Sequence, residues 1–210
     1  MATAVAARVV LDEAILVSAV SKLVSLDADL ARVVALYGPP PLWVREPGFP
    51  SLLYIILEQQ VSLASARALY QRVLGAVRPL TPGRFLKLTD VQLRELGFSR
   101  QKALYARLLA KAIRGRQLAL HKLHELEDHH ARAQLMALKG IGVWTADIYL
   151  MSALRRPDIW PVGDSGAGHG GAGSEGTAAE TVTEKAGEPV PVVASLALGG
   201  GPHLLARISQ

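Results

Sequence analysis

Two glycines on either side of one isoleucine interrupt an otherwise helical stretch. In LMALKGIGVWTAD, apolar residues at helical spacing lead up to Gly140, and the spacing resumes after Gly142. Leu135, Leu138 and Ile141 are expected to face a core. Because glycine adopts positive φ and leaves room for another backbone, the stretch predicts two helices joined by a very short turn.

The second helix of this hairpin is expected to begin at Val143 with unpaired N–H groups. These donors and the positive end of the helix dipole suit a phosphate oxygen. A tight helical hairpin without any ligand is the alternative, and the chain is then only a helical scaffold.

Cap and stop signals divide most of the chain into helices. Ser62 and Ser99 are placed as N-caps, and Thr89 with Gln92 forms a capping box. The expected helices are 11–36, 49–60, 62–77, 89–96, 99–114, 131–139 and 143–155. No run reads convincingly as a strand, so the sequence predicts an all-α fold.

The chain changes character after Asp164. Residues 165–210 hold 10 of the 19 glycines and no Phe, Trp or Tyr. Such a segment buries too little apolar area to offset the entropy cost of ordering. We therefore expect a domain over residues 1–164 and a mostly disordered, Gly/Ala-rich tail over 165–210.

Charge and cysteine content narrow the classes of function. The net charge is +5, and the tail is net negative, so the first 164 residues carry the positive excess. A basic domain attracts nucleic acid or another anionic surface. The absence of cysteine excludes disulfides, thiol nucleophiles and cysteine-ligated metals. The N-terminus reads as an amphipathic helix and not as a signal or membrane anchor, which makes an intracellular protein the default.

Three separated motifs together resemble one family. L-x-G-I-G-x-x-T-A is similar to the helix-hairpin-helix signature of DNA repair glycosylases, and IILEQQVSLASARALY (55–70) resembles a segment of their alkylation-repair branch, typified by DNA-3-methyladenine glycosylase II. PGFPSLLYII and GFSRQKALYARLLAKAI also fit that branch. The resemblance covers residues 27–164. It implies a monofunctional glycosylase that hydrolyses the N-glycosidic bond of alkylated bases during base excision repair.

The resemblance also implies roles for the hairpin. In the family, the hairpin grips a DNA phosphate, often with a monovalent cation held by hairpin carbonyls. The DNA-binding residues implied here are Lys139, Gly140, Ile141, Gly142, Val143 and Thr145. The carbonyls implied for a Na⁺ or K⁺ ion are those of Met136, Leu138 and Ile141. No cofactor is expected to be required.

An ionised carboxylate is needed to stabilise the positive charge that develops on the sugar as the base leaves. Asp164 lies 22 residues after Gly142, where the family keeps its catalytic aspartate. Its alternative role is a loop or capping residue. Asp158 comes six residues too early for the family pattern, and Asp147 is expected to be a surface or capping contact.

Electron-rich aromatic rings attract cationic alkylated purines. Trp144 occupies a position that resembles a pocket tryptophan of this branch, and Trp160 and Tyr54 are further pocket candidates or, equally, core residues. Glycosylases that also cleave the strand carry a lysine at the position of Trp144, which forms a Schiff base. Tryptophan cannot form a Schiff base, so release of the base without strand cleavage is expected.

Two further clusters have competing interpretations. The resemblance implies that Gln59 and Gln60 also bind DNA: the pair lies where the family keeps the wedge that fills the gap left by a flipped base, and Gln60 is the expected wedge. An amide pair that satisfies helix ends is the alternative. The histidines at 121, 124, 129 and 130, with Glu125 and Asp128, could suggest a metal site, but their spacing is not H-E-x-x-H and the segment is strongly polar, which predicts a solvated helix face.

The sequence departs from the family after Asp164. The family continues with helices that wall the pocket, whereas here SGAGHGGAGSEG follows, which suggests an alternative or frameshifted C-terminus lacking those helices. The second hypothesis is therefore a catalytically impaired, DNA-binding remnant of the family. The expected partner is double-stranded DNA with damaged bases, without a membrane. The chain is expected to be a monomer, in the bacterial cytoplasm or the eukaryotic nucleus.

Overall fold

The computed structural model describes residues 9–161, and these fall into two compact units, 11–43 and 44–161 with Val9 and Val10. The first unit holds α1 (Glu13–Leu26) and α2 (Ala28–Tyr37). The second holds α3 (Phe49–Glu58), α4 (Leu63–Ala76), α5 (Pro82–Phe85), α6 (Asp90–Leu96), α7 (Arg100–Arg114), the 3₁₀ helix η1 (Leu120–Glu125), α8 (Asp128–Met136) and α9 (Val143–Ser152). Residues 9–161 contain no strand, which confirms the all-α prediction.

The expected single helix over 11–36 is wrong, because Asp27 divides it. The backbone of Asp27 is extended, and its Oδ1 accepts hydrogen bonds from the N–H groups of Asp29 (2.9 Å) and Leu30 (3.0 Å). Asp27 thereby ends α1 and caps α2. The caps expected at Ser62, Thr89 and Ser99 are confirmed, the second as a complete capping box.

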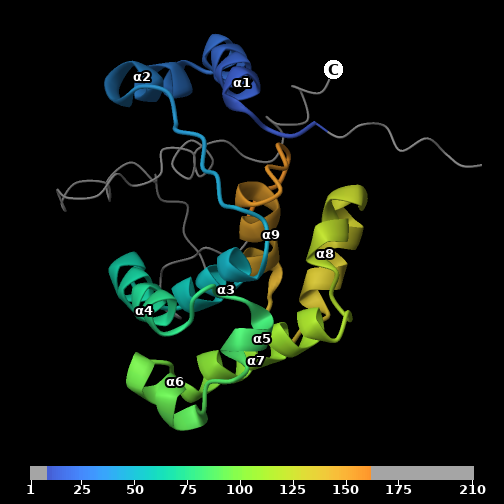
Figure 1. The fold of residues 1–210 in the computed structure, drawn as a ribbon. Coiled ribbons are helices and arrows are strands. Elements are labelled where there is room, and N and C mark those ends of the chain that lie inside the picture. The colour runs from blue at the N-terminus through green and yellow to red at the C-terminus, as the bar shows by residue number, and fades with distance from the viewer. Residues whose placement is uncertain (1–8, 162–210) are drawn as a thin grey trace, which may run out of the picture. The chain divides into compact units, whose positions relative to one another are not determined.

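Helix α3 forms the centre of the second unit. It packs against α4, α7 and α9, and Figure 1 shows it between α4 and α9. Leu52, Leu53, Ile55, Ile56 and Leu57 have no exposed surface, so this helix is apolar on nearly all sides, as predicted. Helix α3 ends at Glu58, and Gln59 and Gln60 form the corner before α4.

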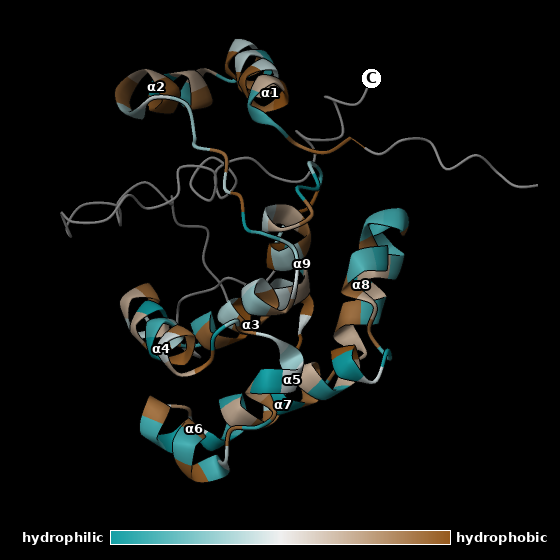
Figure 2. Cartoon of the chain, viewed as in Figure 1, coloured by the Kyte–Doolittle hydropathy of each residue, from teal (hydrophilic) through white to brown (hydrophobic). Residues whose placement is uncertain are grey.

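Helices α8 and α9 form the predicted hairpin and pack against each other. A buried arginine orders the chain ahead of α8: Arg156 donates to Asp128 Oδ1 (2.8 Å) and to the carbonyls of Leu123 (3.1 Å) and Leu126 (2.9 Å). The histidines in this segment, at 121, 124, 129 and 130, are exposed, which confirms the solvated face, and α8 is largely hydrophilic in Figure 2.

None of the helices in the described part of the chain combines the length and apolar character needed to cross a bilayer. The predicted boundary at Asp164 and the predicted tail lie outside the described residues.

Candidate functional site

The hairpin turn connects Ala137, which caps α8, to Gly142, which caps α9. Ile141 is 5% exposed, and its N–H donates to the carbonyl of Leu138 at 3.1 Å. Leu135 is buried and Leu138 packs against the core, so the three predicted anchors do face inward. Apolar side chains that pack into the core therefore anchor the turn.

The exposed residues of the turn are Ala137, Lys139 and Gly142, and Val143, which begins α9, is exposed as well. Gly142 has φ −88° and ψ 179° and makes no side-chain cap hydrogen bond to the first turn of α9. Apart from its two chain neighbours, no atom of residues 9–161 lies within 4 Å of the position that a Cβ atom on Gly142 would take. The amino end of α9 is thus open to a ligand. Thr145, by contrast, is 2% exposed, so its side chain faces the protein.

Gly140 has a different environment. Its φ is +97°, and a Cβ atom here would overlap the aromatic ring of Tyr105 from α7. The expectation that another backbone approaches this glycine is wrong, because a side chain fills the space. Tyr105 was not singled out from the sequence, and no sequence pattern marks it as the partner of residue 140.

The two glutamines at the α3–α4 corner, Gln59 and Gln60, have different environments. The side chain of Gln59 donates from Nε2 to the carbonyl of Gly140 (2.9 Å) and to Thr145 Oγ1 (2.8 Å). Gln60 is exposed and has φ +55°, an uncommon value for a residue other than glycine. Gln59 therefore bonds to the hairpin, while Gln60 stays available for the predicted wedge.

The three aromatic candidates do not form one cluster in the described part of the chain. Trp144 and Trp160 are both half-buried, and Trp144 Nε1 is enclosed with no hydrogen-bond partner among the described residues. Tyr54 stacks on Tyr70 (ring centroids 4.5 Å apart), and the Arg45 guanidinium lies over the Tyr54 ring at 4.9 Å. Tyr54 is thus engaged by two neighbours, and the choice between its pocket and core roles stays open. The pocket roles of Trp144 and Trp160 stay predictions.

Asp147 is not the surface or capping residue that was expected. It is 1% exposed, and its Oδ1 accepts a hydrogen bond of 2.6 Å from Arg132 Nε, so the pair joins α9 to α8. Its Oδ2 is buried and has no partner among the described residues. Burial raises the pKa of this carboxyl, and the hydrogen bond and charge of Arg132 only partly offset that effect.

The catalytic carboxylate and the cation site were also predicted from the sequence. Asp158 is exposed, and Asp164 lies outside the described residues, so its catalytic role stays a prediction. The Leu138 carbonyl accepts one hydrogen bond, which leaves it a second lone pair for a cation. The cation set of Met136, Leu138 and Ile141 also stays a prediction.

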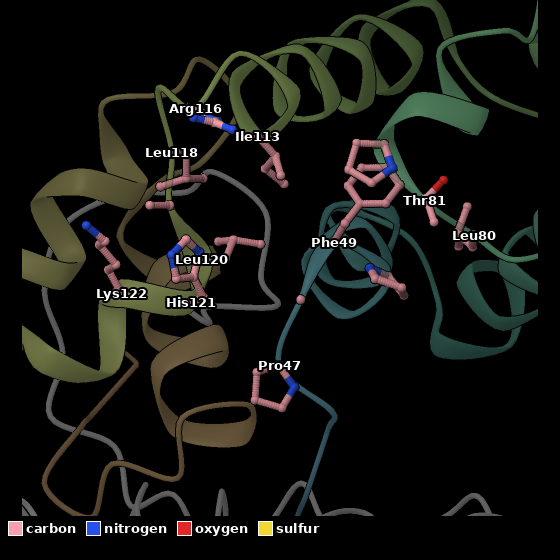
Figure 3. A pocket seen from close by; sticks show the side chains of 14 residues that line it. Pro47, Phe49, Leu80, Thr81, Ile113, Arg116, Leu118, Leu120, His121 and Lys122 are labelled. Carbon is pink, nitrogen blue, oxygen red and sulfur yellow. The ribbon is translucent and has the colours of Figure 1, made fainter.

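A pocket of about 860 Å³ lies elsewhere on the second unit and contains none of the predicted site residues. Its apolar wall includes Phe49, Leu80 and Ile113, and Arg116 and Lys122 lie at its edge (Figure 3). The pocket lies at the amino end of α3. Gln59 and Gln60, which form the corner beside the hairpin, follow the carboxyl end of this ten-residue helix.

Comparison with known proteins agrees with this geometry. The family profile described as HhH-GPD superfamily base excision DNA repair protein matches residues 53–185. The crystal structure of a DNA-3-methyladenine glycosidase from Bacillus halodurans is 32% identical, with a TM-score of 0.60 over 70% of this chain and 69% of that chain. The chain belongs to the HhH-GPD superfamily of base excision DNA repair proteins.

Two further relatives extend the comparison. The DNA-3-methyladenine glycosylase of Bacillus subtilis is 28% identical over 133 residues, which are 58% of this chain and 44% of the relative. The Schizosaccharomyces pombe 3-methyladenine DNA glycosylase, solved with abasic DNA, is 24% identical and shares the fold with a TM-score of 0.64, over 69% of this chain and 73% of that chain. The chain spans about half the length of the first curated relatives it matches.

Proposed function

We propose that this chain is a monofunctional DNA glycosylase that releases alkylated bases from double-stranded DNA. The observation that carries the proposal is the open amino end of α9. Gly142 has no side-chain cap, and apart from its chain neighbours no atom of the described residues lies within 4 Å of its Cβ position, so the N–H groups of the first turn can donate to a DNA phosphate. Lys139, exposed on the same turn, adds a positive charge.

The residues around the hairpin supply the later steps. Gln60, exposed at the corner, fills the gap in the base stack once the nucleotide has flipped out. The half-buried Trp144 offers an aromatic face to a cationic base. Asp164 stabilises the positive charge that develops on the sugar and orients the attacking water. Because Trp144 cannot form a Schiff base, the product is an abasic site in an intact strand.

The test is single-turnover base release from methylated duplex DNA, with Asp164→Asn compared with the full-length wild type. We expect the variant to lose on the order of 100-fold or more in rate, because it lacks the stabilising charge. Asp158→Asn, which alters an exposed carboxylate six residues earlier, serves as the matched control and is expected to keep the wild-type rate. Borohydride must trap no protein–DNA adduct.

The second candidate function is a DNA-binding remnant without catalysis, and the departure from the family sequence after Asp164 motivates it. If wild type and Asp164→Asn both release no base but bind DNA with the same steep salt dependence, the remnant is the correct assignment. If DNA binding shows no salt dependence either, the hairpin is only a helical turn.

A further inference from the structure

Gln59 joins two elements that are distant in sequence. The two hydrogens of its side-chain amide go to the Gly140 carbonyl (2.9 Å) and to Thr145 Oγ1 (2.8 Å), 81 and 86 residues away. Gly140 precedes the open end of α9, and Thr145 lies in its first turn. A planar amide with both donors engaged holds its own backbone at a defined place relative to the hairpin.

Helix α7 supports the same two elements. Lys102 donates from Nζ to the carbonyl of Leu57 at the end of α3 (2.6 Å), and partial burial lowers the pKa of this lysine. Tyr105, one turn further along α7, fills the space beside Gly140. Gln101 donates to the Tyr105 hydroxyl at 2.8 Å. The corner and the hairpin therefore rest on one helix, and Gln59 connects them directly.

The residue after Gln59 is the exposed Gln60, with φ +55°. A left-handed conformation costs energy for a residue with a Cβ atom and persists only where its surroundings impose it. The bonds of Gln59 hold the residue immediately before Gln60, so they restrain the position from which the Gln60 side chain leaves the corner.

We propose that Gln59 is a positioning residue that couples the phosphate contact of the hairpin to the insertion of Gln60 into the base stack. The inference rests on the proposed function for the roles of hairpin and wedge, and it assigns Gln59 the task of keeping them in register. When a phosphate binds at the open end of α9, Gln59 holds the corner so that Gln60 lies opposite the displaced nucleotide. Because both of its amide hydrogens are engaged within the protein, this role replaces the direct DNA contact predicted for Gln59.

The test measures DNA binding without chemistry. The probe is a duplex in which 2-aminopurine lies beside a stable abasic-site analogue, so fluorescence reports a side chain entering the stack. Gln59→Met keeps the length of the side chain and removes both donors. We expect it to weaken binding to this duplex about tenfold, because the corner that carries Gln60 is no longer preorganised and must be ordered on binding. Gln117→Met, at an exposed position beyond α7, is the control and is expected to bind like wild type.

A double-mutant cycle separates coupling from a loss of structure. If Gln59 acts through Gln60, Gln59→Met costs about tenfold in the wild-type background and less than about twofold when Gln60→Ala is already present. Equal costs in the two backgrounds overturn the proposal, because Gln59 then only stabilises the fold. At saturating protein, the 2-aminopurine signal that reports insertion must also be smaller for Gln59→Met than for wild type. A signal equal to that of wild type overturns the proposal as well.

Gln59→Glu gives an independent test. Ionised glutamate cannot donate to the Gly140 carbonyl, whereas protonated glutamate donates one hydrogen bond. Relative to wild type, the variant is expected to recover binding to the abasic duplex as pH falls towards about 5; a constant deficit contradicts the role of the donor. If wild type inserts a side chain but releases no base, the proposed glycosylase function fails and this inference stands.

Discussion

The two glycines of the hairpin turn have similar sequence contexts and opposite environments. Gly140 has φ +97° and faces the Tyr105 ring, while Gly142 has φ −88° and faces open space. The fold itself requires glycine at position 140, since any side chain there meets both an unfavourable φ and an aromatic ring. The fold places no such requirement on position 142.

The difference indicates what each glycine is for. Gly140 lets the turn close against α7, which is a structural role. Serine, asparagine or aspartate would cap α9 better than glycine at position 142, because their side chains accept a hydrogen bond from the first turn. The missing side chain at Gly142 instead leaves the helix end accessible, which suits a ligand that brings its own acceptor.

The largest effect is expected from Gly140→Ala. The added methyl group overlaps the Tyr105 ring and forces a left-handed conformation on alanine, so the free energy of unfolding should fall by about 3 kcal/mol or more. Urea denaturation measures it. Gly75→Ala is the matched control: Gly75 lies exposed within α4 with no atom near its Cβ position, and alanine there should raise stability by about 0.5–1 kcal/mol.

The next experiment divides that cost between the ring and the backbone. When Tyr105→Ala removes the ring, Gly140→Ala should cost only about 1–2 kcal/mol, the part due to the left-handed φ. A double-mutant cycle in urea gives the coupling. If Gly140→Ala costs the same with and without the ring, packing against Tyr105 does not explain why residue 140 is glycine. The contrast between Gly140 and Gly142 would then rest on the backbone angles alone.

Gly142→Ser should affect stability and DNA binding in opposite directions. The backbone at position 142 already has N-cap geometry, so serine should raise the free energy of unfolding by a few tenths of a kcal/mol. Its side chain also covers donors that a phosphate needs, so duplex affinity should fall about tenfold, or about 1.4 kcal/mol. Fluorescence anisotropy at several salt concentrations tests it. Unchanged affinity would remove the argument that Gly142 is kept open for DNA.

Asp147→Asn should give the smallest effect and tests the bond that joins the two sides of the hairpin. Because burial raises the pKa of Asp147 in the folded protein, the native state holds this proton more tightly than the unfolded chain. Wild-type stability should therefore decline relative to the variant as pH rises from about 4 to about 7. Urea unfolding across that range checks the sign. A difference independent of pH would show that Arg132 compensates for the burial.

Local signals explain why much of the fold is predictable from the sequence. The capping residues Ser62, Thr89 and Ser99 act on neighbours three residues away, so their effect can be recognised without a structure. The apolar run of α3 predicts burial for a similar reason. The same local reasoning failed at Asp27, where helical spacing continues through a residue that ends one helix and caps the next.

The candidate site was predictable only in part. The order of the motifs placed the hairpin, the corner glutamines and Trp144, and the G-I-G spacing alone predicted an open helix end. Sequence singled out Gln60 as the wedge but could not show that Gln59 bonds to the hairpin, because the hydrogen bonds of Gln59 reach residues more than 80 positions away. It also misplaced Asp147, since a polar residue next to the hairpin gives no sign of an arginine on the facing helix.

The sequence by itself determined that this protein is helical, basic in its first 164 residues and built around a glycine hairpin, because periodicity, charge and caps act over a few residues. The tertiary structure alone decided which glycine the fold requires, which glutamine bonds to the hairpin and which aspartate is buried. Those outcomes depend on side chains brought together from α3, α7, α8 and α9, and packing between distant segments leaves no local pattern in a single chain.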